Sequence, residues 1–161
     1  MSTRAAAWLL LAAAVAAPLS AAAQTTTADG KAVEAAVEHF LDVLGNRDLD
    51  GLPALFAPQA TMAVIRQRDG QWTATAQSFQ EWLGALRSQT TTTRFREPLT
   101  GVSVHVEDGR LAFLRADFTV VIDGQVRSHG VDYFTLVKDG DGWKILNGAY
   151  TSHPGAPKPT K

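Results

Sequence analysis

The chain has 161 residues, of which 45% are hydrophobic, 19% charged and 8% aromatic, with a formal charge of −1 and no cysteine. This composition is typical of one soluble globular domain and excludes collagen-like, coiled-coil and disordered chains. Without a thiol, disulfide scaffolds, cysteine nucleophiles and thiolate zinc sites are excluded as well. The near-zero charge gives no reason to expect nucleic acid or an anionic membrane as a partner.

The first segment has the features of a secretory signal peptide. Arg4 is its only charge, an apolar stretch runs over residues 5–19, and small residues follow up to Ala23. The stretch is shorter than the roughly 20 apolar residues of a membrane-spanning helix, and it ends in a site that signal peptidase accepts. We therefore predict a signal peptide over residues 1–23 and an exported protein, periplasmic or secreted, with no membrane contact after cleavage.

The remainder is predicted to be one domain between two loose ends. Residues 24–31 form a polar leader, and residues 154–161 contain three prolines and two lysines, which is typical of a disordered tail. The segment between them, 32–153, is long enough for one sizeable core but not for two.

Two helices are expected at the start of this domain. Apolar residues recur at intervals of three and four over residues 33–44, which predicts a helix that Gly45 ends. Asp50 is a suitable N-cap for a short second helix, which Pro58 ends.

A hairpin and a third helix follow. The pattern predicts short strands over residues 61–65 and 72–75, joined by a turn at 68–71. Ser78 and Glu81 then have the spacing of a capping box, in which each residue satisfies a backbone N–H of the other, so we expect a helix to begin there.

The second half of the chain is predicted to be an antiparallel meander. Four strand-like segments are separated by aspartate-glycine pairs, which favour tight hairpin turns. The expected fold class is therefore α+β, with a curved antiparallel sheet packed against three N-terminal helices. The four expected strands cover residues 93–106, 111–122, 125–137 and 143–151.

Strand alternation predicts which side chains face the helices. In 111–122 the more apolar face is taken as the inner one, and in 125–137 Asp132 shares a face with Phe134 and therefore points inward. The outer face of the sheet is expected to carry Arg115, Asp117, Arg127, His129 and Tyr133. The inner set of the first of these strands is Ala112, Leu114, Ala116, Phe118, Val120 and Ile122.

The order of these elements resembles the nuclear transport factor 2-like superfamily, which includes SnoaL-like polyketide cyclases, ketosteroid isomerase and the putative lumazine-binding family. The resemblance rests on the segments 46–52, 54–58 and 60–61 before the hairpin, and on 132–137 and 142–145 near the end. It implies a cone-shaped, cystatin-like fold with a pocket between the helices and the concave sheet. It also implies a homodimer formed through the outer sheet face.

The resemblance assigns one catalytic position and leaves two others empty. Asp132 falls where ketosteroid isomerase has a protonated aspartic acid that donates to an oxyanion, and a carboxyl in an apolar pocket can stay protonated. The isomerase's catalytic base lies on the first strand, where this chain has Thr-Met-Ala-Val-Ile at 61–65 and no acid. The isomerase's catalytic tyrosine aligns with Phe40, which has no hydroxyl group. The isomerase reaction is therefore not expected.

Two readings of the function follow, and a third stays open. The favoured one is an exported small-molecule-binding domain for a hydrophobic or aromatic molecule, without cofactor. The alternative is a cofactor-independent isomerase, dehydratase or cyclase that uses Asp132 as acid or oxyanion donor. The third is a dimeric accessory module without a ligand. A second titratable group beside Asp132 would favour the enzyme. The residues expected to bind the ligand are Asp132, Phe40, Phe56, Trp82, Leu114, Phe118 and Phe134.

No metal site is expected from the four histidines. His39 lies off the apolar stripe of its helix, His129 is assigned to the outer face, and His153 borders the tail. His105 has one neighbouring acid, Glu107, whereas a metal site needs about three ligands. The facing of three further polar residues stays open: Arg96, Asn147 and Tyr150.

Overall fold

The computed structural model describes residues 28–158. The predicted signal peptide, its cleavage site and the first part of the predicted leader lie outside the described residues. Within them, no helix is long and apolar enough to cross a membrane. The elements are α1 (Ala28–Gly45), the one-turn 3-10 helix η1 (Leu52–Leu55), β1 (Phe56–Arg68), β2 (Gln71–Ser78), α2 (Phe79–Ser88), β3 (Leu99–Glu107), β4 (Leu111–Ile122), β5 (Gln125–Asp139) and β6 (Gly142–Pro154).

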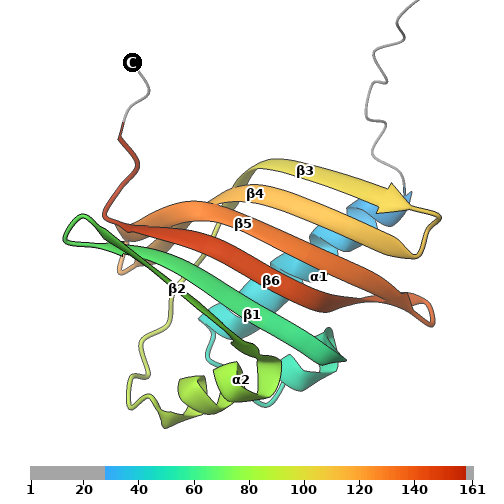
Figure 1. The fold of residues 1–161 in the computed structure, drawn as a ribbon, viewed down its shortest axis with the longest axis horizontal. Coiled ribbons are helices and arrows are strands. Elements are labelled where there is room, and N and C mark those ends of the chain that lie inside the picture. Colours follow the sequence, from blue (N-terminus) through green and yellow to red (C-terminus); the bar gives the residue numbers. More distant parts are fainter. Residues whose placement is uncertain (1–27, 159–161) are drawn as a thin grey trace, which may run out of the picture.

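The six strands form one curved sheet in the order β2-β1-β6-β5-β4-β3. Figure 1 shows α1 crossing behind this sheet and α2 below the β1–β2 end. The meander β3–β6 is antiparallel as expected, but β1 pairs with β6 in parallel. The reason is that α2 and the segment after it carry the chain from one edge of the sheet to the other, and parallel neighbours require such a crossover.

The expectation of three α-helices is corrected to two and a single 3-10 turn. Gly51 occupies the N-cap position of η1 without a side-chain cap, and the chain is already extended at Phe56. Asp50 does not cap this turn: it lies one residue before the N-cap, and its exposed carboxylate pairs with Arg87 at 2.7 Å. Too few residues separate Gly51 from β1 for more than one helical turn.

The local signals at the turns and at α2 are confirmed. Ser78 and Glu81 form both hydrogen bonds of the capping box. The pairs at 69–70, 108–109 and 123–124 all have positive φ at both residues, a conformation that aspartate and glycine tolerate. The hairpin strands are longer than expected, whereas 93–98 forms one isolated bridge, Arg96 with Val121, and not a continuous strand.

The core lies between α1 and the inner sheet face. The inward position predicted in β4 is confirmed for Ala112, Leu114, Ala116 and Phe118, which are at most 3% exposed. The last two members of the predicted set, Val120 and Ile122, are partly exposed. At the N-terminal end, α1 begins at Ala28 and not after the predicted leader. Its first turn is held to β5 by an ion pair between Asp29 and Lys138 at 2.6 Å.

Candidate functional site

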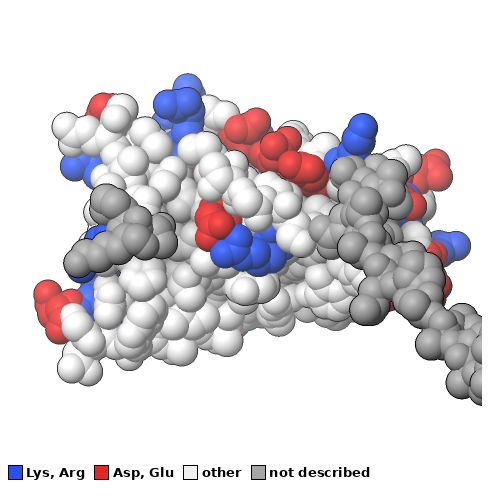
Figure 2. Space-filling model, turned by 90° about the horizontal axis from the view of Figure 1, so that it is seen from above, with Lys and Arg blue, Asp and Glu red and all other residues white. Residues whose placement is uncertain are grey.

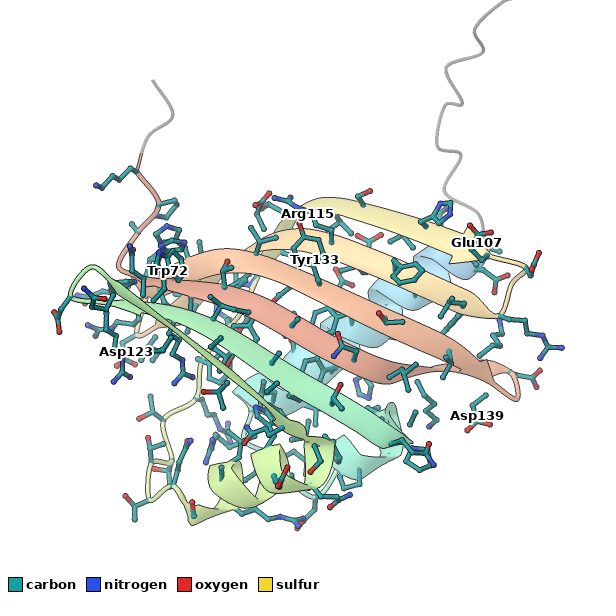
Figure 3. The ribbon with its side chains drawn as sticks, viewed as in Figure 1. Trp72, Glu107, Arg115, Asp123, Tyr133 and Asp139 are labelled. Atoms are coloured by element: carbon teal, nitrogen blue, oxygen red, sulfur yellow. The ribbon has the colours of Figure 1, made fainter. Side chains whose placement is uncertain are left out.

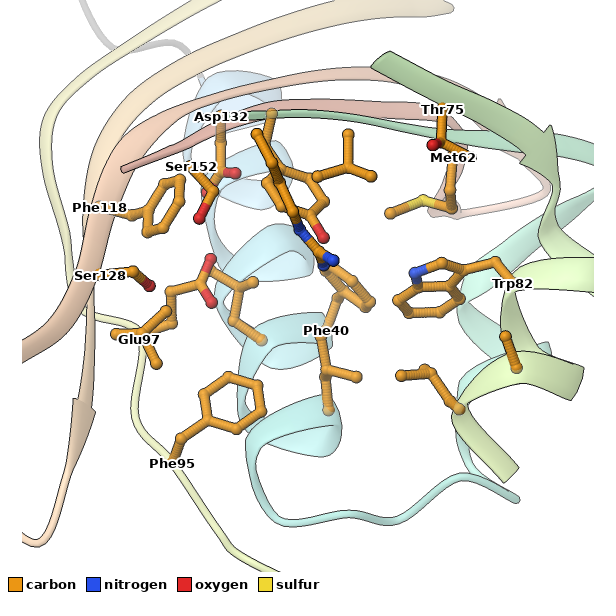
Figure 4. A pocket seen from close by; sticks show the side chains of 18 of the residues that line it. Phe40, Met62, Thr75, Trp82, Phe95, Glu97, Phe118, Ser128, Asp132 and Ser152 are labelled. Carbon is orange, nitrogen blue, oxygen red and sulfur yellow. The ribbon is translucent and has the colours of Figure 1, made fainter. Parts of the chain in front are cut away.

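A cavity of about 460 Å³ lies between the concave sheet face, α1, α2 and the segment that connects α2 to β3. Figure 4 shows Trp82 and Met62 on one side of it, and Phe118, Ser128 and Glu97 on the other. Such a volume is in the range of small-molecule sites, and its walls combine aromatic surface with a few polar groups, as those sites do. The aromatic wall consists of Phe40, Trp82, Phe95, Phe118, Phe134 and Tyr150.

Asp132 lies at the inner face of β5, in the middle of the sheet. It pairs in register with Ala116 on β4 and with Tyr150 on β6. The residue is 2% exposed, and no N–H or O–H donor of the described residues reaches its Oδ2 atom. A buried carboxylate without a donor is costly, so this oxygen needs a proton or a ligand.

Glu97 is the acidic partner of Asp132, and it comes from outside the sheet. The Phe95 N–H donates to the Gly45 carbonyl at the end of α1, at 3.1 Å, and Arg96 bridges to Val121. These bonds turn Phe95 and Glu97 toward the cavity, and Arg96, between them, is exposed. The Glu97 carboxyl thereby comes within hydrogen-bonding reach of Asp132.

Burial raises the pKa of both carboxyls. The pKa of Glu97 rises from 4.5 to about 8 because burial penalises its charge, and because the Asp132 charge and hydrogen bond oppose ionisation further. Burial raises the pKa of Asp132 from 3.8 to about 7, while the hydrogen bond from Glu97 acts in the opposite direction. Two carboxyls in contact cannot both ionise cheaply, so they share a proton near neutral pH.

A phenol and a guanidinium complete the polar part of the wall. Burial raises the pKa of the Tyr150 phenol, and the Arg66 charge and hydrogen bond partly counteract this. Arg66 projects from β1 on the same face as Tyr150, one strand away. The cavity therefore holds proton donors, a proton acceptor and the Arg66 cation beside its aromatic wall, and Arg47 also lines it.

Most of the residues expected around a ligand do line this cavity. Asp132, Phe40, Trp82, Phe118 and Phe134 lie on its wall. Two others lie in the apolar core instead.

Those two residues are Phe56, which stacks on Phe79 with ring centroids 4.1 Å apart, and Leu114, which is 1% exposed. Side-chain alternation placed Leu114 on the inner face correctly, but the α1 side of the core covers that part of the face.

The three polar residues whose facing the sequence left open are now placed. Tyr150 lies in the cavity, Arg96 is exposed, and Asn147 donates to Thr61 Oγ1 across β6 and β1 at 2.8 Å. Glu97 was not predicted as a site residue from the sequence. The signal was the alternation of Phe95, Glu97 and Leu99, which puts the acid on the side of two apolar residues.

Outside the cavity, the outer sheet face carries the predicted polar residues and exposed aromatic rings. Arg115 and Asp117 form a two-point ion pair at 2.6 and 2.7 Å, and Tyr133 is 57% exposed beside them. Figure 3 shows Arg115 and Tyr133 on the sheet side away from α1. The view in Figure 2 shows one row of acidic side chains and several small mixed groups of acidic and basic side chains on a largely uncharged surface.

The histidines lie outside the cavity wall. His39 is exposed on α1, and His105 pairs with Glu107 at 2.7 Å on β3. Across residues 28–158, no group of three or more histidine, aspartate or glutamate side chains is placed to hold a metal ion.

The sequence model of one protein family, described as putative lumazine-binding, matches residues 28–151. No curated protein matches the chain. Among solved structures, a protein of unknown function with a cystatin-like fold from Nostoc punctiforme is 15% identical, with a TM-score of 0.64, and the match covers 81% of this chain and 96% of that one.

Two structures from Novosphingobium aromaticivorans are also similar. A nuclear transport factor 2-like protein with a cystatin-like fold is 16% identical, with a TM-score of 0.60 and coverage of 76% of this chain and 80% of that one. A structure described as a putative scytalone dehydratase is 12% identical, with a TM-score of 0.57 and coverage of 81% and 88%. At these identities the similarity shows the fold.

Proposed function

Since the chain belongs to the putative lumazine-binding family, in the nuclear transport factor 2-like superfamily, we propose that it is an exported protein whose cavity binds a small aromatic molecule. The observation that carries this proposal is the Asp132 Oδ2 atom, which is buried without a donor on the wall of a cavity of about 460 Å³. A ligand that brings a hydrogen-bonding group to this atom satisfies a buried polar atom that the described residues leave without a partner.

The wall indicates the chemistry of this ligand. Phe40, Phe118 and Trp82 offer flat apolar surface to a ring system, and the shared proton of Asp132 and Glu97 offers a donor to a ring carbonyl or ring nitrogen. A planar heteroaromatic molecule with carbonyl groups at one edge, such as lumazine, matches both features.

The second candidate function is acid–base catalysis by the same groups. It is supported by Glu97, because a second titratable group beside Asp132 supplies the base that the strand 61–65 lacks. In an isomerase of this kind, the ionised carboxyl takes a proton from carbon, while the protonated carboxyl or Tyr150 donates one to the carbonyl oxygen, so that charge does not accumulate. This step transfers only protons, so it requires no cofactor.

Ligand binding is tested by native mass spectrometry of the protein purified from its own cells, together with titration of lumazine followed by its fluorescence. Asp132→Asn keeps the shape of the side chain but abolishes proton sharing with Glu97, so we expect binding to weaken at least about tenfold. The matched control is Asp139→Asn, an exposed aspartate on the same strand, which should bind as the unmodified protein does.

Three outcomes separate the candidates. If Asp132→Asn weakens binding and Asp139→Asn does not, the result supports ligand binding in the cavity. Incorporation of deuterium from D₂O into the bound molecule, lost in Glu97→Gln, supports catalysis. An empty protein that binds no aromatic probe would contradict both and favour the accessory module.

We also propose a homodimer in which the outer faces of two sheets pack together. Phe113 and Tyr133 are 47% and 57% exposed on this face, and both α-helices lie on the other side of the sheet. Light scattering should report a dimer at micromolar concentration, and Tyr133→Glu should raise its dissociation constant at least about tenfold, because a buried charge would replace an aromatic contact. Glu38→Gln on α1 is the control. A monomeric unmodified protein would refute this assembly.

A further inference from the structure

Two histidines form a pair on the outer sheet face, on the opposite side from the cavity. His129 on β5 and His153 on β6 are direct partners in the strand register. Their rings stack with centroids 5.1 Å apart and an angle of 17° between the planes. Both side chains are partly exposed. From the sequence, His129 was expected on the outer face and His153 at the border of the tail, because β6 was expected to end at 151.

The hydrogen bonds of the pair determine where each ring carries its proton. The Nδ1 atom of His129 lies 2.8 Å from the Gly155 carbonyl oxygen, and that of His153 lies 3.2 Å from Gln67 Oε1. Carbonyl and amide oxygens only accept, so in each neutral ring Nδ1 is the donor. The other nitrogen, Nε2, then keeps its lone pair, and no hydrogen bond to it is found within residues 28–158.

This is the arrangement in which proteins prepare histidine for a metal ion. A ligating imidazole characteristically donates its other N–H to a carbonyl or carboxylate, which orients the ring and raises its basicity. Here both rings have such a partner, and they come from adjacent, register-paired strands. To bind one ion together, the two Nε2 atoms must converge, which requires the side-chain torsion angles to change from the stacked arrangement.

We propose that His129 and His153 form a two-histidine site for a divalent transition-metal ion, with water as the remaining ligands. Imidazole nitrogen favours Cu²⁺, Ni²⁺ and Zn²⁺, whereas Mg²⁺ and Ca²⁺ need oxygen ligands. By the Irving–Williams order, Cu²⁺ binds more tightly than Ni²⁺. This site is independent of the cavity and of the function proposed for it.

The structure also contains a reporter for the site. Trp72 on β2 contacts the His153 ring edge-on, with centroids 5.1 Å apart at 85°, and it is 49% exposed. Trp143 is 8% exposed in the core, and Trp82 lies on the cavity wall. A paramagnetic ion held by His153 lies next to the Trp72 indole and should quench its fluorescence.

The test is a titration of the tag-free protein with Ni²⁺ and Cu²⁺, followed by tryptophan fluorescence and by calorimetry for stoichiometry. We expect saturable binding of one ion per chain, lost or weakened at least about tenfold in both His129→Gln and His153→Gln. Gln67→Leu, which removes the acceptor for His153 Nδ1, should weaken binding by about 10- to 100-fold. Trp72→Phe should lose the quenching but keep the calorimetric signal.

His39→Gln is the matched control, because it removes an exposed histidine from α1 and should leave binding unchanged. Urea unfolding without metal checks that each variant is folded. Binding that survives either His129→Gln or His153→Gln at full affinity would overturn the site, as would the absence of saturable binding in the unmodified protein. Saturable Mg²⁺ or Ca²⁺ binding with equal affinity would overturn the proposed ligand chemistry.

Discussion

Replacing Glu97 with glutamine should remove about half of the loss of stability that the protein shows between pH 5 and pH 8. The folded pKa of Glu97 is about 8 and that of Asp132 about 7, above the ordinary values of 4.5 and 3.8. The folded protein therefore binds more protons than the unfolded chain in this range, so the free energy of unfolding falls as pH rises. Each additional bound proton contributes a slope of about 1.4 kcal/mol per pH unit.

We expect the unmodified protein to lose on the order of 6 kcal/mol of stability across this range. Glu97→Gln keeps the hydrogen-bonding reach of the side chain without an ionisable group, and burial still raises the pKa of Asp132, so part of the slope should remain. The double variant with Asp132→Asn should be nearly independent of pH there.

Urea unfolding at several pH values, followed by tryptophan fluorescence, measures these slopes. The other clearly shifted carboxyls, Asp29 and Glu81, have lowered pKa values and act only at more acidic pH. Glu38→Gln, an exposed acid on α1, is the control and should keep the full slope. A stability that is flat or rising between pH 5 and pH 8 in the unmodified protein would show that the two carboxyls do not share a proton.

Replacing Gly130 with alanine should destabilise the protein by about 3 kcal/mol or more. A Cβ atom at this position would overlap the Thr151 carbonyl oxygen on β6 and lie 2.9 Å from Phe118 Cε1. Because the first contact is with backbone, relief requires β5 and β6 to move apart beside Asp132. Ligand binding should therefore weaken together with stability.

Gly84→Ala is the matched control for this substitution. Gly84 is exposed in α2, and a Cβ atom there would have no neighbour within 4 Å. Since alanine favours helix over glycine, we expect a gain of up to about 1 kcal/mol. Thermal unfolding of the two variants compares them directly. Equal effects would mean that β5 and β6 do not approach each other closely at Gly130.

The fold could be predicted in large part because most of its signals are local. The capping box at Ser78 and the aspartate-glycine turns act within a few residues, and their physics is the same in any fold. Asp132 could be placed on the inner face for a similar reason, because alternation along β5 depends only on the strand that carries it.

The second helix and the first strand were less predictable, because their outcome depends on distant partners. Asp50 has the chemistry of an N-cap, but in the folded chain Arg87 from α2 takes its carboxylate. The spacing of Phe56 from its apolar neighbours predicted that it lies in a helix, but it pairs with Ile145 of β6 and stacks on Phe79. Tertiary contacts of this kind override weak local preferences.

By itself, the sequence determined the fold class, the inward position of Asp132 and the aromatic character of the cavity. These features follow from hydrophobic periodicity and turn residues, which are local properties of each segment of the chain. Only the tertiary structure decided that Glu97 meets Asp132, that β1 lies parallel to β6, and that His129 stacks on His153. These pairs join residues that are 24 or more positions apart. Which such residues meet depends on how the sheet curves and closes, a property of the whole packed chain.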